Sequence, residues 1–555
     1  MIRELRINGQ LVRPSMNGVF GAFPAARQRN ASVVGSQSTE DTVISTRNRF
    51  PIEHVIVLML ENRSYDHMLG YLPNGHGLAG DEFNLVDPSD PTSERVRVSN
   101  RSGYITAVDP AHDFVSVQKQ LFGEPGHVVK PAPMNGFVDV HIEQAKGDVE
   151  IGKKIMECFD PGKIPALTTL AHEFCVCDRW FSAVPGPTWL NRFYAHAATC
   201  DGMIVDSAKH NYRMKTIYEA LAENGFSWNI YYGDVPQSII LEHHWRTLDH
   251  FRRFERFYAD LEKGDLATYS FIEPRYLSFH EWKATDQHPP HDVRLGEYLI
   301  AEVYDTLRNS QLWERSLLVV LYDEHGGFFD RVPPPDSVPS PDGKKSKHPP
   351  FDFTRLGVRV PAILVSPFVE KGQVDSTIYE HSSLPATIKT LFSLPEGLTA
   401  RDKAANTFEK NLSRSIPRSD TPLTLPVPGE PEEDPVPLHD ARVRYYAGAG
   451  HYPGRNSSPG PHDPAPDPYP RPEPGLLFSH RAVFSNDRDR LCPQYLVQPP
   501  RVANGLPSPR SNGYPEKERS GYPGHGQLHC SKECLIRRFH HQCDIGAACG
   551  TGKTG

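Results

Sequence analysis

Two apolar runs, each ending at a pair of polar residues, constrain the fold of this chain more than any other feature. Residues 55–60 are apolar and lead into Glu61 and Asn62, and residues 317–322 lead in the same way into Asp323 and Glu324. A strand without polar interruptions is typical of a parallel sheet that helices cover on both faces. The carboxyl ends of such strands form the edge at which open α/β sheets bind ligands. The sequence therefore predicts an α/β fold with a functional site at these strand ends.

A third apolar run, residues 360–365, ends at Ser366. If the three strands are adjacent and parallel, the polar residues that follow the first two runs meet at one edge of the sheet. Carboxylates packed together raise one another's pKa unless a cation lies among them. Oxygen ligands favour a hard or borderline divalent metal ion. We therefore expect a divalent metal site, with the metal's identity open, formed by Glu61, Asn62, Asp323 and Glu324.

A turn rich in proline and glycine precedes a predicted helix at Thr188. Residues 184–187 read Val-Pro-Gly-Pro, which excludes a helix, whereas residues 188–198 contain good helix formers. Thr188 therefore falls at a helix start, where threonine is a favoured N-cap residue. A hydroxyl beside a helix N-terminus and a metal ion is also a candidate nucleophile. The spacing alone leaves both roles open.

Four segments in order carry a resemblance to a known family. The chain resembles the bacterial and fungal phosphoesterase family that contains phosphocholine-preferring phospholipases C and a respiratory-burst-inhibiting acid phosphatase. The matching segments are residues 61–67, 185–192, 286–290 and 322–330, within about residues 50–396. In two places this chain departs from the family pattern: Leu190 stands where the family usually has proline, and Arg331 stands where a histidine is common.

The resemblance implies a fold and a set of site residues. The family has an alkaline-phosphatase-like, three-layer α/β/α fold around a mostly parallel sheet. By resemblance, the metal ligands are Glu61, Asn62, Asp323 and Glu324, together with Thr188 as the nucleophile. The remaining residues implied at the site are His288 near the transferred phosphoryl group, His112 as a second active-site histidine, and Asn191, Arg192 and His325 for substrate binding.

These residues together predict a metal-dependent hydrolase of phosphate esters that works through a phospho-threonine intermediate. His288 or His112 would protonate the leaving alcohol. The substrate is a phosphate ester or a phospholipid headgroup, and the choice between monoester and diester stays open. An alternative is a non-catalytic relative that binds a phosphorylated ligand. A sulfatase is disfavoured, because residues 188–192 do not supply the Cys/Ser-x-Pro-x-Arg pattern that sulfatases need.

The two ends of the chain differ from the span that carries the motifs. We expect an N-terminal extension over residues 1–49, a catalytic domain over 50–410, a disordered proline-rich linker over 411–480 and a poorly ordered Cys/His-containing tail over 481–555. Residues 421–475 contain 15 prolines, which supports the linker. The tail could hold a zinc site, disulfides or unpaired thiols, and linker and tail could instead form a partner-binding module.

Charge and hydropathy exclude several other partners. The formal net charge of −8 argues against nucleic-acid binding and provides no polybasic segment for anionic membranes. No run approaches the roughly 20 apolar residues that a membrane span needs. Residues 1–49 show no signal-peptide core, which favours a cytoplasmic location, although members of the family are often exported. The oligomeric state stays open.

Overall fold

The structure is a computed structural model that describes residues 51–429 except 74, 76, 124–127, 279–281 and 396. It also describes a short hairpin near the amino terminus, in which β1 (Leu5–Ile7) pairs antiparallel with β2 (Gln10–Val12). The predicted tail, residues 481–555, and the predicted linker from residue 430 onward lie outside the described residues. So does the rest of the predicted N-terminal extension.

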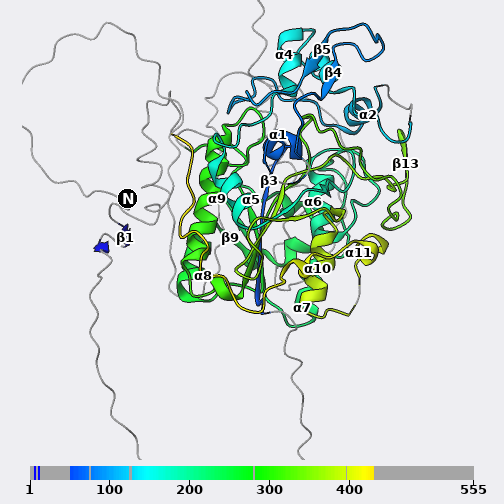
Figure 1. Cartoon of the computed structure of the whole chain (residues 1–555). Coiled ribbons are helices and arrows are strands. Elements are labelled where there is room, and N and C mark those ends of the chain that lie inside the picture. Colours follow the sequence, from blue (N-terminus) through cyan, green and yellow to red (C-terminus); the bar gives the residue numbers. More distant parts are fainter. Residues whose placement is uncertain are drawn as a thin grey trace, which may run out of the picture. The chain divides into compact units, whose positions relative to one another are not determined.

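An eight-stranded sheet forms the centre of the fold (Figure 1). Its strands, in spatial order, are β15 (Gln373–Asp375), β6 (Cys175–Cys177), β14 (Ala362–Val365), β11 (Ser316–Tyr322), β3 (His54–Leu60), β10 (Tyr269–Glu273), β8 (Trp228–Tyr232) and β9 (Phe251–Arg253). Within this sheet, β14 runs antiparallel to its neighbours and the other strands run parallel to one another. The predicted mostly parallel sheet is confirmed.

The two strands that end in polar pairs are direct neighbours. β3 and β11 pair in parallel along their whole length, with Leu60 opposite Tyr322. Every residue of β11 and all of β3 after His54 are buried, as the unbroken apolar runs predicted. Because Glu61 follows Leu60 and Asp323 follows Tyr322, the two polar pairs leave the sheet side by side.

The third apolar run does not have the predicted direction. β14 lies next to β11, but Leu318 pairs with Val365 in an antiparallel ladder. The connection from β11 to β14 stays at the carboxyl edge of the sheet, where Arg359 contacts the segment that follows β3. The chain therefore re-enters the sheet from that same edge and must run backwards, which carries Ser366 to the opposite edge.

Helices cover both faces of the sheet, giving the expected three-layer α/β/α arrangement (Figure 1). One layer contains α5 (Pro165–Glu173), α8 (Glu255–Lys263) and α9 (Val293–Arg308), and the other contains α6 (Thr188–Ala197), α7 (Ile217–Glu223) and α10 (Ser383–Leu391). α9 illustrates the local logic: Asp292 accepts from the backbone N–H of Arg294 as its N-cap, and the buried residues recur on one face. The main apolar core lies between these layers and the sheet.

A smaller group of elements surrounds a second apolar cluster. These elements are β4 (Phe83–Leu85), β5 (Arg95–Arg97), α2 (Phe114–Phe122), α3 (Phe137–Gln144), α4 (Val149–Lys153) and η1 (Lys154–Met156). Phe328 and Phe329, which follow β11, are members of this cluster. In Figure 1 the group lies above α1 (Tyr65–Leu69), which follows β3. The segment after β11 therefore ties this group to the edge of the sheet where Glu61 and Asp323 emerge.

The remaining described elements are short connections and edge pairs. They are β7 (Trp180–Phe181), β16 (Tyr379–Glu380), β12 (Ser346–Lys347), β13 (Pro350–Phe351), α11 (Ala400–Ala404), η2 (Gln237–Ile240), η3 (Glu242–Arg246), η4 (Leu248–His250), η5 (Trp313–Arg315) and η6 (Glu409–Asn411). Within the described part of the chain, no helix is long and apolar enough to span a membrane.

The beginning of the predicted linker packs along α9. The Tyr304 hydroxyl donates to the carbonyl of Pro422 at 2.7 Å, and the Tyr298 hydroxyl donates to that of Pro428 at 3.0 Å. Leu425 is buried in the main core. Residues 411–429 are therefore part of the packed structure, although proline is frequent among them.

Candidate active site

Backbone hydrogen bonds fix the two polar pairs against each other. The Asp323 Oδ1 atom accepts from the N–H of Asn62 at 3.0 Å and from the N–H of Glu324 at 2.6 Å. Asn62 has a φ of 58°, in the left-handed region that asparagine tolerates better than most residues. This bend ends β3 and turns the Asn62 side chain toward α6. The predicted ligands Glu61, Asn62, Asp323 and Glu324 are thus brought together, and all four are buried.

Arg192 lies between two of the predicted metal ligands. Its Nε atom donates to Asp323 Oδ2 at 3.0 Å, and its Nη2 atom lies 3.3 Å from Glu61 Oε1. Gln237 also donates to Glu61 Oε1, at 2.6 Å. The guanidinium is buried with both carboxylates, and its Nη1 atom is buried without a hydrogen-bond partner. The structure therefore places Arg192 as the counter-ion of the strand ends.

Thr188 is the first residue of α6 and faces the end of β3. Its Oγ1 atom lies 3.5 Å from Asn62 Oδ1 and donates to it. The N-cap position belongs to Pro187, and no side chain caps the helix there. The N-cap role considered for Thr188 is therefore not the one that the structure shows. The hydroxyl is directed at a predicted ligand, as a nucleophile at this site requires.

Asn191 holds the turn that presents Thr188. Its Oδ1 atom accepts from the N–H of Val184 at 3.0 Å, and its Nδ2 atom donates to the carbonyls of Gly186 at 2.9 Å and Pro187 at 3.2 Å. The side chain is fully buried. Its amide is engaged by the turn, so Asn191 positions the helix start and does not face a substrate.

His112 and His288 lie beside each other over the strand ends. Their ring centroids are 5.7 Å apart and the rings are nearly perpendicular. The carbonyl of Pro110 contacts Nδ1 of His112 at 2.8 Å, and that of Pro289 contacts Nδ1 of His288 at 2.5 Å. In both histidines Nε2 is therefore the ring nitrogen that the backbone carbonyl does not engage. His112 Nε2 lies 3.4 Å from Asn62 Nδ2.

His325 is brought close to the site but is turned into the protein. Its Nδ1 atom lies 3.3 Å from Glu324 Oε2, and its Nε2 atom contacts Gln120 Oε1 at 2.9 Å. Its ring packs edge-on against Phe137 in the smaller group of elements. Both ring nitrogens have protein partners, so His325 orients Glu324.

The segment Arg63–His67, which helped to carry the resemblance, connects three loops of the site. Arg63 donates through Nε and Nη2 to the carbonyl of Gln287, at 2.9 and 2.6 Å, and its guanidinium lies over the ring of Phe328. Ser64 caps α1 and donates to the carbonyl of Phe329 at 2.6 Å. His67 stacks on Phe328 with ring centroids 3.9 Å apart. These side chains hold the loops that carry His288 and Glu324, and take no position at the reacting groups.

The carboxyl groups of the site have strongly shifted pKa values. Burial raises the pKa of Glu61 well above its usual range, and it raises that of Asp323 to about 7, although Arg192 acts in the opposite direction on both. Burial also acts to raise the pKa of Glu324, but the charges of His112 and His325 and the hydrogen bonds that it accepts leave it below the usual value. Burial thus disfavours the ionised forms of Glu61 and Asp323 even beside Arg192, and a bound cation would favour those forms.

The oxygen atoms at the site are ligands of the kind that a hard divalent ion prefers. Glu324 Oε1 is buried and has no hydrogen-bond partner, while Oε2 accepts from the N–H of Gly326 at 2.8 Å. A buried carboxylate oxygen left without a partner is costly unless something binds it. Among the described residues, no group of three or more His, Cys, Asp or Glu side chains is arranged as a metal cluster. The fit therefore rests on mixed donors, in which the amide of Asn62 and the hydroxyl of Thr188 stand beside the carboxylates.

Several residues at the site escaped the sequence analysis. Asp286, in the segment that carries His288, accepts from its N–H and binds His291. His381 contacts the carbonyl of Asp323 and accepts from Trp180 Nε1. The motif around His288 could have indicated Asp286. Gln237, at the start of η2, and Asp206, in the loop after α6, belong to segments without a recognisable pattern, and only the folded chain brings them to the site.

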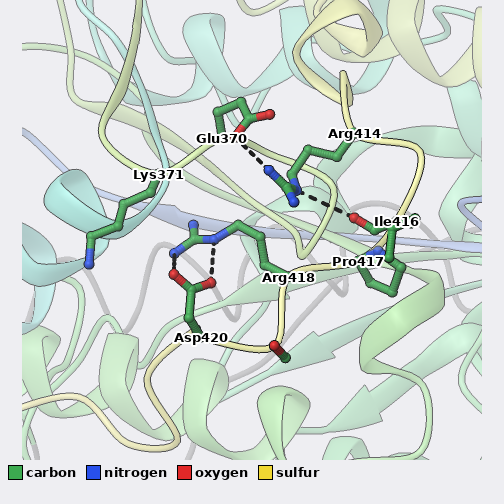
Figure 2. A pocket seen from close by; sticks show the side chains of 8 residues that line it. Glu370, Lys371, Arg414, Ile416, Pro417, Arg418 and Asp420 are labelled. Carbon is green, nitrogen blue, oxygen red and sulfur yellow. Dashed lines mark hydrogen bonds and ion pairs between the residues drawn. The ribbon is translucent and has the colours of Figure 1, made fainter.

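A surface hollow of 470 Å³ lies away from these residues (Figure 2). It is lined by residues 370–371, 414 and 416–420, none of them a predicted site residue. Figure 2 shows Arg414 paired with Glu370 at 2.8 Å and Arg418 paired with Asp420 at 2.8 Å. The third cation that lines the hollow, Lys371, pairs with Glu173 at 2.7 Å. The hollow therefore offers no unpaired charge to a ligand, and the chemistry of the chain lies at the strand ends.

The chain is similar to several known proteins. A model of the Phosphoesterase family matches residues 52–395. The non-specific phospholipase C1 of Arabidopsis thaliana is 41% identical over 399 residues, which cover 68% of this chain and 74% of that protein. Phospholipase C B of Mycobacterium tuberculosis is 26% identical over 425 residues, covering 66% and 78%. A solved structure of an alkaline phosphatase superfamily protein from Vibrio parahaemolyticus has 15% identity and a TM-score of 0.27, covering 44% of this chain and 65% of that one.

The family match spans both polar pairs, the turn before Thr188 and the loop that carries His288. It therefore covers every residue from which the site is built, and the relatives at about 40% identity extend over the same part of the chain. This chain belongs to the Phosphoesterase family and is a hydrolase that acts on phosphate ester bonds.

Proposed function

We propose that this protein hydrolyses phosphate esters, phospholipids among them, by attack of the Thr188 hydroxyl on phosphorus. The observation that carries the proposal is the position of Thr188 Oγ1, at the start of a helix and 3.5 Å from Asn62 Oδ1, beside a cluster of buried carboxylates. The names of the relatives, phospholipases C from a plant and from a bacterium, support a phospholipid headgroup as the substrate.

Different residues take part in different steps of the proposed reaction. Thr188 Oγ1 attacks phosphorus, the alcohol departs, and the phosphoryl group with its remaining substituent stays on Thr188 until water releases it. His112 and His288 both have Nδ1 held by a backbone carbonyl, so Nε2 carries a proton only in the imidazolium form. Burial opposes that form in both, but the charges of Glu324 and Asp109 raise the pKa of His112 above its usual value, whereas the pKa of His288 is lowered. Protonated His112 can therefore give the leaving alcohol its proton from Nε2. Asn191 and Arg63 act indirectly, by holding the turn before Thr188 and the loop before His288.

Glu61, Asn62, Asp323 and Glu324, with Thr188, are the residues that would hold a divalent ion. Such an ion supplies positive charge that lowers the pKa of a hydroxyl and neutralises charge on phosphoryl oxygens. The buried Glu324 Oε1 atom accepts no hydrogen bond and lies 4.0 Å from His112 Nε2. This atom and the raised pKa values of Glu61 and Asp323 support the assignment.

Replacement of the nucleophile tests the proposal. Thr188→Ala should lower kcat on a chromogenic phosphate ester by on the order of 10³-fold or more, whereas Thr188→Ser should keep measurable activity because it retains a hydroxyl. The panel should contain p-nitrophenyl phosphate, p-nitrophenyl phosphorylcholine and phosphatidylcholine vesicles, each with and without added divalent ions. Full activity of Thr188→Ala on every substrate would show that another group is the nucleophile.

The same panel separates the enzyme from a binding protein. A non-catalytic relative would bind phosphorylated ligands but release no p-nitrophenol and no diacylglycerol with any metal ion. Mass spectrometry of acid-quenched enzyme should also detect a phosphoryl adduct on Thr188 in the active protein.

A further inference from the structure

Asp206 lies at the start of the helix that carries the nucleophile. It belongs to the loop after α6, and its Oδ2 atom accepts from the N–H of Trp189 at 3.4 Å. The N–H of Leu190 and the charge of His112 also act on this carboxyl group. Asp206 is exposed to solvent, in contrast to the buried carboxylates at the strand ends. The carboxylate of Asp206 therefore contacts the residue that directly follows Thr188 in α6.

A helix N-terminus normally attracts an anion, because its free N–H groups and dipole favour negative charge. At α6 the carboxylate of Asp206 already occupies this position. A phosphoryl group attacked by Thr188 must come close to the same helix start, and so it meets the charge of Asp206. The repulsion grows with the negative charge that the substrate brings.

Phosphate esters differ in that charge. A phosphomonoester has a second pKa of about 6 and carries close to two negative charges above neutral pH, whereas a diester carries one. Two unit charges 4 Å apart interact by about 1 kcal/mol even in water, which is roughly a fivefold change in affinity, and by more where solvent is partly excluded. One fixed carboxylate beside Thr188 is therefore enough to discriminate between the two classes.

We propose that Asp206 is a specificity-determining residue that makes the site favour monoanionic phosphodiesters over dianionic phosphomonoesters. The inference rests on the proposed function and names the substrate class of the same site. It requires Asp206 to act through its charge. A carboxylate that merely caps α6 would support the helix equally for every substrate.

Neutral replacements that can still cap the helix separate these two roles. Asparagine and serine both accept from helix N–H groups, so Asp206→Asn and Asp206→Ser remove the charge and keep the acceptor. Asp148 provides a matched control, because it is an exposed aspartate that accepts from the N–H of Ile151 at the start of α4. Although Asp206 is exposed as a residue, desolvation of its carboxyl group by the surrounding protein raises its pKa to about 7, so assays at pH 8 keep both that carboxyl group and a monoester mostly ionised.

The measurement is kcat/KM for p-nitrophenyl phosphate and for bis(p-nitrophenyl) phosphate with each enzyme. We expect Asp206→Asn and Asp206→Ser to raise the monoester-to-diester ratio by about fivefold to tenfold. Asp148→Asn should leave the ratio unchanged. The increase should shrink at high ionic strength, because salt screens an exposed charge.

An equal change in kcat/KM for both substrates would overturn the inference and leave Asp206 as a helix cap, while the proposed function would stand. A ratio that falls in both neutral variants would overturn it as well. If the unaltered protein shows no turnover of either substrate, the proposed function is refuted instead. If Asp206→Asn does not fold, Asp206→Ser and the ionic-strength dependence of the unaltered enzyme still decide the question.

Discussion

The Nε atom of Arg192 donates to Asp323 Oδ2 at 3.0 Å, in a setting where both side chains are almost completely excluded from solvent. The same guanidinium reaches Glu61. One arginine from α6, the helix that begins at Thr188, thus pairs with carboxylates at the ends of two neighbouring strands. This contact links the position of α6 to the geometry of the proposed metal site.

Removal of Arg192 should make the protein depend on a divalent ion. Arg192→Met leaves Glu61 and Asp323 without a cation, and loss of one partner of a buried ion pair costs about 3–5 kcal/mol. We expect a lower Tm than that of the unaltered protein, and a larger rise in Tm when Mg²⁺, Ca²⁺ or Mn²⁺ is added. Differential scanning calorimetry with and without a chelator measures both effects.

Arg359→Met is the matched control for this experiment. Arg359 is equally buried and pairs with Asp66 and Asp330, both at 2.9 Å, neither of which is a predicted ligand. Its loss should lower Tm without increasing the response to metal. An equal metal response in the two variants would count against an ion among Glu61, Asp323 and Glu324. The neutral Arg192→Gln can replace Arg192→Met if the latter does not fold.

Gly326 allows the loop after β11 to approach the end of β3. It has a φ of 61°, and a Cβ atom added there would lie 2.2 Å from the carbonyl oxygen of Asn62. Gly326→Ala must therefore displace the backbone of a predicted ligand. We expect kcat to fall by at least about a hundredfold, since small misplacements of catalytic groups have effects of this size.

Gly225→Ala is a control that introduces the backbone strain of a positive φ without the steric clash that Gly326→Ala causes. It also has a positive φ, 79°, but a Cβ atom there meets nothing within 4 Å. Gly225→Ala should cost about 1–2 kcal/mol of stability for the left-handed conformation and leave kcat unchanged. Similar kcat values for the two alanine variants would show that the close approach at Gly326 is not needed for activity.

Acid should destabilise the protein through buried histidines such as His141. Burial lowers the pKa of His141 to about 4, below the value of 6.5 for an exposed histidine. Because the folded state resists protonation, stability is fully present above pH 6.5 and falls as the pH drops from 6.5 to 4, by about 3 kcal/mol for a pKa difference of this size. The difference in Tm between pH 7 and pH 5 measures the effect.

His141→Leu should reduce that difference, because leucine binds no proton in the unfolded state. His172→Leu is a suitable control, as His172 is exposed on α5. Other buried histidines with lowered pKa values, His67, His196, His244 and His381, keep part of the acid sensitivity in either variant. An unchanged pH dependence in His141→Leu would contradict the assigned pKa.

The stable catalytic unit should end near residue 429. Truncation after residue 429 keeps the hydrogen bonds from Tyr298 and Tyr304 and the burial of Leu425, so that Tm and turnover should stay as in the full chain. Truncation after residue 410 uncovers this part of α9 and should lower Tm by several degrees. If the shorter form were as stable as the longer one, the packing of residues 411–429 on α9 would contribute nothing measurable. If a binding partner of the full chain did not bind the form that ends at residue 429, and turnover stayed intact, residues 430–555 would have a partner-binding role.

Much of the fold and part of the site follow from the sequence. The unbroken apolar runs before Glu61 and Asp323 predict strands that are buried on both faces, as is typical of a mostly parallel sheet covered by helices. The Pro-Gly-Pro turn predicts a helix start at Thr188, because proline and glycine exclude a helix before it. Both are local patterns of hydrophobicity or backbone restriction, and each involves only residues that are adjacent in the sequence.

Other features depend on contacts between distant segments, which no local pattern specifies. The antiparallel direction of β14 follows from the path of the chain along one edge of the sheet. The engagement of Arg192 and Asn191 by buried partners, where substrate binding was expected, follows from how α6 packs against β3 and β11. Gln237 and Asp206 reach the site only because their loops fold over it. The sequence by itself thus determined which groups can perform the chemistry, and the tertiary structure decided which of them face the reacting atoms, because burial and charge pairing depend on the whole fold.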